Sequence, residues 1–206
     1  TCPLDDILQG LVTSRRAVFE QTGSELSAAG PAQPSMSALL NLGESSPIHH
    51  ISQIMSNAIT KFESVHQLPE RAAALFVMYQ TLRWQICPTK ENYYRLPEWL
   101  RPLPCQNSIA HPIWMDYVPW PKMRNIICQD HLKYDQNEFF LPYVQTLSLN
   151  WPYEPMDCVV VQSDMINSSI SPIFERHVRN LDNWSLGDSF KTAYPSLVGT
   201  YRLKNQ

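Results

Sequence analysis

The sequence has 206 residues, a formal net charge of −3, 44% hydrophobic residues and 17% charged residues, which suits one domain or one domain with an appendage. Six Trp, nine Tyr and seven Phe can bury a substantial core, which excludes global disorder. The mild acidity argues against a free-standing nucleic-acid binder, and the longest strictly apolar run, from Ala72 to Tyr79, is far shorter than the roughly 20 residues that span a bilayer.

The start of the chain and its cysteines indicate a cellular compartment. No basic-then-apolar leader follows Thr1, so we expect no signal peptide. The five cysteines stand far apart and include no CxxC pair, which fits a reduced, intracellular protein whose thiols serve as small buried hydrophobes.

The first part of the chain divides into a helix and a linker. Apolar residues recur at helical spacing from Leu4 to Phe19, which predicts an N-terminal helix within residues 1–21. Residues 22–47 are rich in Ser, Ala, Gly and Pro, so we expect a flexible linker with one weakly helical turn. Residues 48–206 then form the helical core domain, and the whole chain is expected to be one regulatory domain.

Two helices are expected at the start of that core. Ser46 and Pro47 suit the N-terminus of a helix whose apolar face carries Ile51 and Met55. Pro69 and Pro88 bound the next helix, which is apolar nearly all round and is therefore expected at the centre of the fold.

The middle of the chain is expected to be irregular. Seven prolines between Pro88 and Pro121 exclude long helices. We expect short helical turns and extended pieces, fixed to the surface of the helices by Trp99, Trp114 and Trp120.

The last third is expected to carry short helices and one hairpin. A helix from Pro121 to about Gln129 is followed by one that Asp135 and Glu138 open as a capping box and that Pro142 kinks. The remaining predicted elements are a strand at 159–161 paired with 168–170, a helix after Ser171, and a short helix from Ser185. The fold class is therefore mainly α: a single-domain helical bundle with a Pro/Trp-rich irregular segment and a short β-hairpin.

A search for catalytic and metal-binding motifs gives no match. The six glycines cannot form a phosphate-binding loop, a GxGxxG turn or a GxSxG elbow. No HExxH motif exists, and His49 and His50 are adjacent, so they point to different sides of a helix. We therefore expect no cofactor, no metal and no enzymatic activity.

Three groups of residues permit both a functional and a structural interpretation, and we favour the structural one for each. His111, Asp116 and Arg124 could perform acid–base chemistry, or could be hydrogen-bonded struts of an irregular backbone. Arg83 could bind a ligand carboxylate, or could form a bridge with Glu98 or Asp116. The tryptophans could line an apolar pocket or form the core.

Seven ordered blocks carry a family resemblance. They are Arg83–Thr89, Leu96–Pro102, His111–Asp116, Pro119–Arg124, Asn150–Tyr153, Ser171–His177 and Asn183–Gly187. Together with the opening Cys2–Asp5, they resemble the C-terminal domain of unknown function of filamentous-fungal basic leucine zipper transcription factors. The resemblance runs from Cys2 to about Leu197, with departures at Leu103–Cys105 and at Asn125, where an Asp is usual.

The resemblance implies a non-catalytic regulatory domain of a nuclear transcription factor. DNA would be contacted only through an upstream basic leucine zipper, because no Lys/Arg-rich run and no leucine heptads occur within this chain. The expected partners are a small-molecule effector or a co-regulator protein, with a homodimer as a further expectation and no membrane. The candidate ligand-binding residues are Arg83, Trp84, Trp99, Arg101, His111, Trp114, Asp116, Trp120 and Arg124.

Two alternatives stay open. The chain could be an interaction or dimerisation module without a ligand. It could also be an unrecognised enzyme centred on His111 and Asp116.

Overall fold

The computed structural model describes residues 3–40, 50–60, 67–161 and 168–204. Its first helix, α1, runs from Pro3 to Thr22, where the apolar periodicity predicted it. Helix α4, Leu68–Ile86, begins and ends at the predicted prolines. Most residues of α4 are buried, polar ones included, so this helix is central as expected.

The other elements are short and follow the proline pattern. They are α2 (Glu25–Ala29), η1 (Ser37–Leu39), α3 (His50–Thr60), α5 (Lys90–Arg95), η3 (Glu98–Leu100), α6 (Pro104–Ser108), η4 (Ile113–Tyr117), α7 (Pro121–Gln129), η5 (His131–Lys133), α8 (Gln136–Thr146), η6 (Pro155–Cys158), α9 (Pro172–Arg179), η7 (Leu181–Asn183), α10 (Asp188–Ala193) and η8 (Pro195–Leu197). Strands β1 (Val159–Val161) and β2 (Ser168–Ile170) form an antiparallel pair with Val160 opposite Ser169. The described part of the chain is mainly α, which confirms the predicted fold class.

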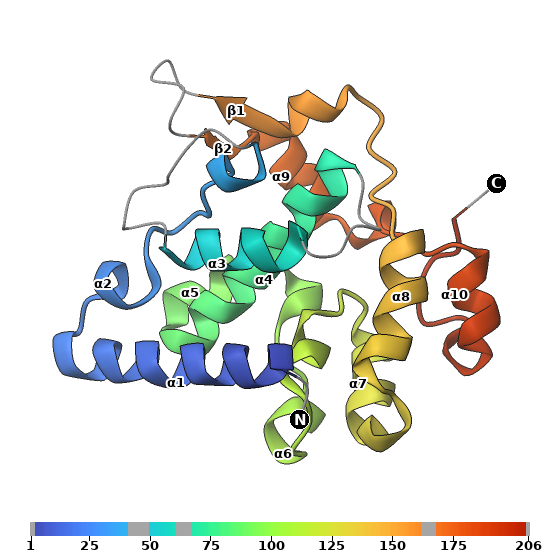
Figure 1. The fold of residues 1–206 in the computed structure, drawn as a ribbon, viewed down its shortest axis with the longest axis horizontal. Coiled ribbons are helices and arrows are strands. Elements are labelled where there is room, and N and C mark those ends of the chain that lie inside the picture. Colours follow the sequence, from blue (N-terminus) through green and yellow to red (C-terminus); the bar gives the residue numbers. More distant parts are fainter. Residues whose placement is uncertain (1–2, 41–49, 61–66, 162–167, 205–206) are drawn as a thin grey trace.

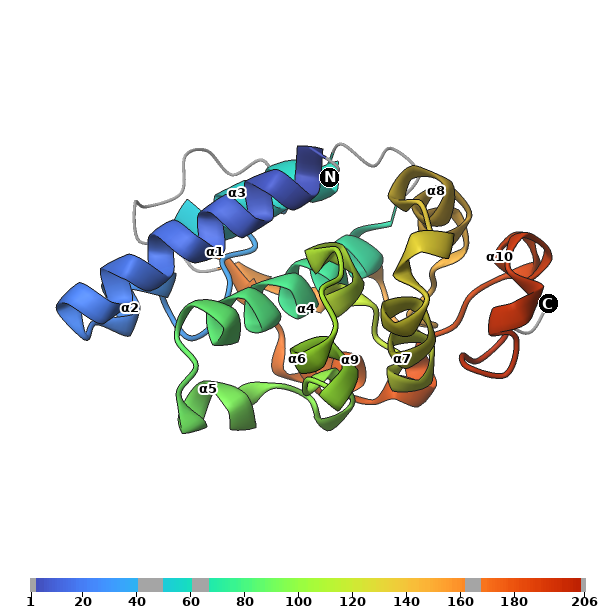
Figure 2. The ribbon, with the colours of Figure 1, turned by 90° about the horizontal axis from the view of Figure 1, so that it is seen from below.

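The helices are arranged around α4. Figure 2 shows α1 and α3 along one side of α4, and α5, α6 and α9 along the other. Helices α7, α8 and α10 lie together at one end of the molecule (Figure 1). The core between these elements contains the fully buried rings of Phe76, Trp114, Phe139, Phe174, Trp184 and Phe190.

The segment expected to be a flexible linker differs from that expectation over residues 24–40. Ser24 caps α2 by accepting a hydrogen bond from the backbone N–H of Ser27. Ala28, Ala29 and Met36 are fully buried. Small side chains allow close approach to α4, and a Ser- and Ala-rich composition is therefore compatible with packing as well as with mobility. Residues 41–47 of the expected linker lie outside the described residues.

Three predicted helix starts have different outcomes in the structure. The short helix expected from Ser185 begins at Asp188, because Ser185 instead pairs with Ser148 in an isolated bridge. Asp135 caps α8 as predicted, accepting from the backbone N–H groups of Asn137 and Glu138. The predicted start of α3 at Ser46 lies outside the described residues, in which α3 begins at His50.

The burial of the cysteines and the apolar content of the helices agree with what the sequence predicts. Cys87, Cys105, Cys128 and Cys158 are free and buried, as predicted, whereas Cys2 lies outside the described residues. No helix within the described ranges has the length and apolar character needed to cross a membrane.

Candidate functional site

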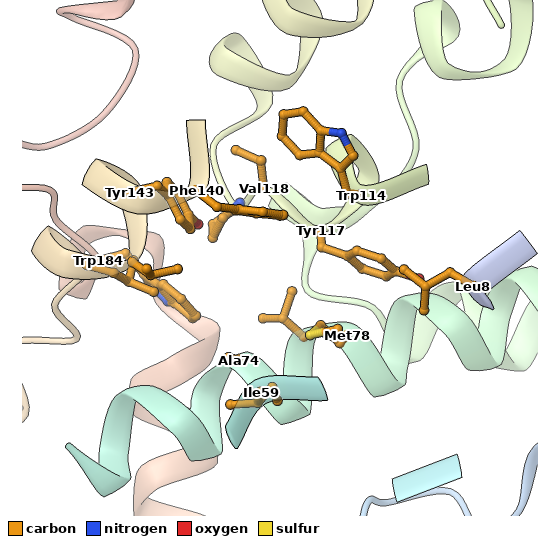
Figure 3. Close-up of a pocket in the computed structure, with 14 residues that line it drawn as sticks. Leu8, Ile59, Ala74, Met78, Trp114, Tyr117, Val118, Phe140, Tyr143 and Trp184 are labelled. Atoms are coloured by element: carbon orange, nitrogen blue, oxygen red, sulfur yellow. The ribbon is translucent and has the colours of Figure 1, made fainter. Parts of the chain in front are cut away.

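An apolar cavity of about 90 Å³ lies beside the central helix. Three elements form most of its wall: α4, the segment from η4 to Pro119, and α8 with the residue after it. The described lining residues are Leu8, Ile59, Ala74, Val77, Met78, Trp114, Tyr117, Val118, Pro119, Phe140, Tyr143, Val144, Leu147 and Trp184. Figure 3 shows Phe140 and Tyr143 across the cavity from Ala74 and Met78, with Trp184 toward one end and Leu8 toward the other.

Local sequence patterns bring these side chains together. Ala74, Val77 and Met78 are three or four positions apart, so they share one face of α4. Phe140, Val144 and Leu147 repeat the same spacing along α8 and its C-terminal end. The prolines on either side of η4 stop it from becoming a long helix, and the short turn therefore places Tyr117 between the two longer helices.

The wall is almost entirely nonpolar, and its two phenols stay neutral. Burial raises the pKa of Tyr117 and of Tyr143 above the ordinary tyrosine value, and the nearby charges of Asp116 and Asp5 add to this effect at Tyr117. The hydroxyl of Tyr117 is buried without a hydrogen-bond partner. No described lining residue is a carboxylate, an amine or an imidazole.

These properties favour the binding of an apolar group in the cavity rather than a catalytic reaction there or the binding of a water molecule. A buried water needs two to four polar partners, and apolar cavities of about 150 Å³ stay dry and bind benzene or xenon. This cavity is smaller, and five aromatic side chains contribute to its wall, those of Trp114, Tyr117, Phe140, Tyr143 and Trp184. It therefore suits a small apolar molecule, or one apolar group of a larger ligand.

His111 and Asp116 do meet, but in a geometry typical of a structural pair. His111 Nε2 lies 3.0 Å from Asp116 Oδ1, and His111 Nδ1 lies 2.7 Å from the carbonyl oxygen of Ile109. With an acceptor at each ring nitrogen, the ring carries both protons. The Asp116 carboxylate, followed by the Cys128 thiol, raises the pKa of His111 to about 11. A protonated ring without a free nitrogen cannot act as a general base at neutral pH.

Asp116 is the centre of a wider polar network. Its Oδ1 also accepts a hydrogen bond from Gln106 Nε2 at 2.5 Å, and its Oδ2 accepts one from Gln85 Nε2 at 2.7 Å. This carboxylate therefore ties α4, α6 and η4 together.

Arg124 is fully buried and holds the irregular segment in place. Its Nε donates to Gln106 Oε1 at 3.2 Å. Its two terminal nitrogens donate to four backbone carbonyls, those of Val118, Pro119, Trp99 and Arg101, at 2.8–3.1 Å. Burial lowers the pKa of Arg124 to about 10. With its donors engaged inside the protein, Arg124 offers nothing to a ligand, which supports the structural interpretation.

Arg83 forms a bridge, but the predicted partners are wrong. Its Nη2 lies 2.6 Å from Glu25 Oε2, and its Nε donates to Asn92 Oδ1 at 3.1 Å. Glu98 instead lies 3.6 Å from Arg101, and Asp116 pairs with His111. Glu25 escaped the sequence analysis because it lies in the segment expected to be a linker.

The remaining candidate residues are distributed over different parts of the fold. Trp114 is the candidate that lines the apolar cavity. Trp99 donates to the carbonyl of Arg179 at 2.9 Å and packs edge-on against Trp184. Trp120 is buried among Tyr143 and Tyr201. Arg101 lies over the ring of Tyr93 at 5.2 Å, and half-buried Trp84 lines a separate polar cleft.

Tyr117, Phe140 and the α4 face were missed by the sequence analysis. A signal for them existed in the helical spacing of Phe140, Val144 and Leu147, although such a stripe more often marks core than a cavity. Within the described ranges, no group of three or more His, Cys, Asp or Glu side chains is placed to hold a metal ion.

Comparison with known proteins identifies one family. The family model described as "Domain of unknown function (DUF3425)" matches residues 79–206. No curated protein and no solved structure matches the chain. The matched region includes η4 and α8 but only the second half of α4, so the wall of the apolar cavity comes from both sides of its boundary at residue 79.

Proposed function

Because the chain belongs to the DUF3425 family of domains of unknown function, we propose that it is a non-catalytic regulatory domain of a fungal bZIP-type transcription factor, acting in the nucleus. In this proposal, an effector with a small apolar group enters the cavity between α4, η4 and α8 and changes the activity of the parent protein. The bZIP association is supported by the seven sequence blocks that resemble the C-terminal domain of such factors.

The apolar cavity is the observation that carries the ligand part of the proposal. A void next to the central helix is destabilising in proportion to its volume, and a ligand that fills it recovers contacts with the wall. Binding to the folded state alone would then stabilise the domain by mass action. In this proposal, effector binding increases the stability of the domain, and most directly that of α4 and α8, which line the cavity.

The polar residues support a regulatory role over a catalytic one. Of the residues best suited to acid–base work, His111 and Asp116 bond to each other, and Arg124 bonds mainly to backbone carbonyls. None of them belongs to the described wall of the apolar cavity.

Native mass spectrometry of the purified domain tests for a bound effector. A mass excess that disappears on denaturation would identify a co-purified ligand. The second measurement is thermal unfolding with benzene, toluene and indole as probes of the cavity, which should raise the midpoint. Ala74→Leu adds three carbon atoms at the cavity wall and should abolish this rise. The exposed Ala17 on α1 gives the matched control Ala17→Leu, which should keep it.

A chimera tests the transcriptional part. The domain is fused to a heterologous basic leucine zipper, and transcription from a reporter is compared with that driven by the zipper alone. We expect a difference that Ala74→Leu changes and Ala17→Leu does not. Equal reporter output from the fusion and the bare zipper would contradict a regulatory role.

An interaction module is the second candidate, because exposed apolar side chains gather around β1. Tyr153, Met156, Val160 and Ile173 are each more than 40% exposed. Met156 lies in η6, Val160 in β1 and Ile173 in α9, and Tyr153 lies two residues before η6. Such exposure is typical of a surface that a partner covers. Light scattering after gel filtration should then show self-association that Val160→Lys abolishes, whereas a monomer at high concentration would remove the homodimer from consideration.

A further inference from the structure

Residues 24–40, which we call the strap, are held on α1 and α4 mainly through their backbone. Six consecutive carbonyl oxygens, those of residues 27–32, each lie within hydrogen-bonding distance of a side-chain donor. The donors are Arg15 on α1 and Tyr79, Gln80 and Arg83 on α4. The oxygen of Pro31, for example, lies 2.7 Å from the hydroxyl of Tyr79 and 2.9 Å from Nη1 of Arg83. Much of the attachment is therefore polar.

An ion pair near the start of the strap adds a latch. Glu25 Oε2 lies 2.6 Å from Nη2 of Arg83, and Glu25 Oε1 accepts a hydrogen bond from Thr89 Oγ1 at 3.0 Å. The side chains of Arg83 and Glu25 are only 6% and 28% exposed. Lost hydration offsets part of the attraction in such a pair, and this hydration returns when the two groups separate in water.

The strap buries few large apolar side chains compared with α4. Ala28 and Ala29 are fully buried, but each contributes only a methyl group. Met36 and Leu39 are its larger buried side chains, whereas Leu26 is 57% exposed. A segment with few buried apolar contacts opens at a lower free energy than the core of the same protein. The strap therefore has a lower local stability than α4.

The junction between α1 and the strap provides a pivot. Gly23 directly follows α1 and has a φ of 64°, a conformation that glycine adopts without steric cost. A change of backbone angles at this residue can carry the strap away from α4.

We propose that the strap opens as one unit while α4 stays folded, with the pair of Glu25 and Arg83 as its latch. Opening uncovers the face of α4 that carries Tyr79, Gln80 and Arg83. By helical periodicity, this face points away from Ala74 and Met78, which line the apolar cavity. The inference goes beyond the proposed function, and either can fail without the other.

Hydrogen–deuterium exchange of the native full chain, followed by NMR, tests this proposal. The backbone N–H groups of Ala28, Gly30 and Met36 donate to Ser24, Leu26 and Ser168, so they report on the closed strap. These three amides should share one opening equilibrium and exchange at least about tenfold faster than the amides of α4.

Two variants separate opening of the strap from global unfolding. Glu25→Gln should speed the exchange of the strap amides about tenfold, the effect of one charge-assisted hydrogen bond. Phe190→Leu alters a fully buried ring on α10, at the opposite end of the molecule from α2 (Figure 1). It should speed the exchange of the α4 amides about tenfold and leave the strap amides unchanged, because the core of α10 stays intact when the strap opens.

Milder changes complete the design. Glu20 is exposed on α1, and Glu20→Gln should change neither set of amides. Tyr79→Phe removes one hydroxyl from the strap contacts and should speed the strap amides about fivefold, which tests the proposal even if Glu25→Gln does not fold. The proposal is overturned if the strap amides of the wild type exchange as slowly as those of α4. It is equally overturned if Phe190→Leu speeds both sets by the same factor, since the strap would then open only on global unfolding.

Discussion

The irregular segment around η3, α6 and η4 depends on one buried side chain, Arg124, and its replacement gives the most direct test of the structural interpretation. Arg124→Met leaves four carbonyl oxygens without this donor, those of Val118, Pro119, Trp99 and Arg101. At about 1 kcal/mol for each unpaired group, the loss is about 4 kcal/mol. Burying the charged guanidinium, which lowers its pKa to about 10, costs free energy. The variant does not bear this cost, and the gain offsets part of the loss. We expect a net destabilisation of about 3 kcal/mol.

The conservative variant Arg124→Lys separates charge from geometry. Lysine keeps the positive charge but has three donors at one point, whereas the guanidinium presents five in a planar fork. It can satisfy at most three of the four carbonyl oxygens, so we expect a loss of at least about 1 kcal/mol. If charge alone mattered, Arg124→Lys would match the wild type.

Urea unfolding followed by tryptophan fluorescence and by circular dichroism measures both variants. Arg176 is exposed on α9, and Arg176→Met should change the free energy of unfolding by no more than about 0.5 kcal/mol. The reasoning is refuted if Arg124→Met stays within about 1 kcal/mol of the wild type, the size of a single hydrogen bond.

Three further predictions concern the pair of His111 with Asp116, the hydroxyl of Tyr117 and the first half of α4. Because the pKa of His111 is raised from 6.5 to about 11 in the folded state, the pair with Asp116 stabilises fully below pH of about 6.5. The free energy of unfolding should therefore fall as the pH rises toward 11, by at most about 1.4 kcal/mol per pH unit, and urea titrations of His111→Gln should lose this slope; an unchanged slope would contradict the assignment. Tyr117→Phe removes a buried, unpaired hydroxyl and should raise the free energy of unfolding by about 1 kcal/mol in the same assay, whereas a decrease would mean that the hydroxyl has a partner. A fragment of residues 79–206 should show no dispersed NMR spectrum, because it lacks the first half of α4 and the buried side chains of Ala72, Leu75 and Phe76; a folded fragment would show that these contacts are dispensable.

The candidate site shows which residues a linear pattern can identify. The sequence predicts a structural bridge for Arg83 and, for Arg124 with His111 and Asp116, hydrogen-bonded struts of an irregular backbone, and both guanidinium groups are buried and bonded. Their partners were not predictable, since Glu25 is far from Arg83 in the chain and the partners of Arg124 are mostly backbone carbonyls, which carry no sequence signal. The cavity was missed for a related reason. Apolar spacing indicates a buried face but does not indicate whether the opposite surface fills the space.

The sequence by itself determined the helical class, the central place of α4 and the proline-bounded ends of the helices, because side-chain periodicity and the missing N–H of proline act locally. Only the tertiary structure decided that residues 24–40 pack onto α4, that His111 is held in its protonated form, and that a cavity remains between α4, η4 and α8. These features depend on groups brought together from distant parts of the chain. Packing, desolvation and hydrogen-bond partners are properties of that three-dimensional neighbourhood, and the spacing of residues along the chain does not encode them directly.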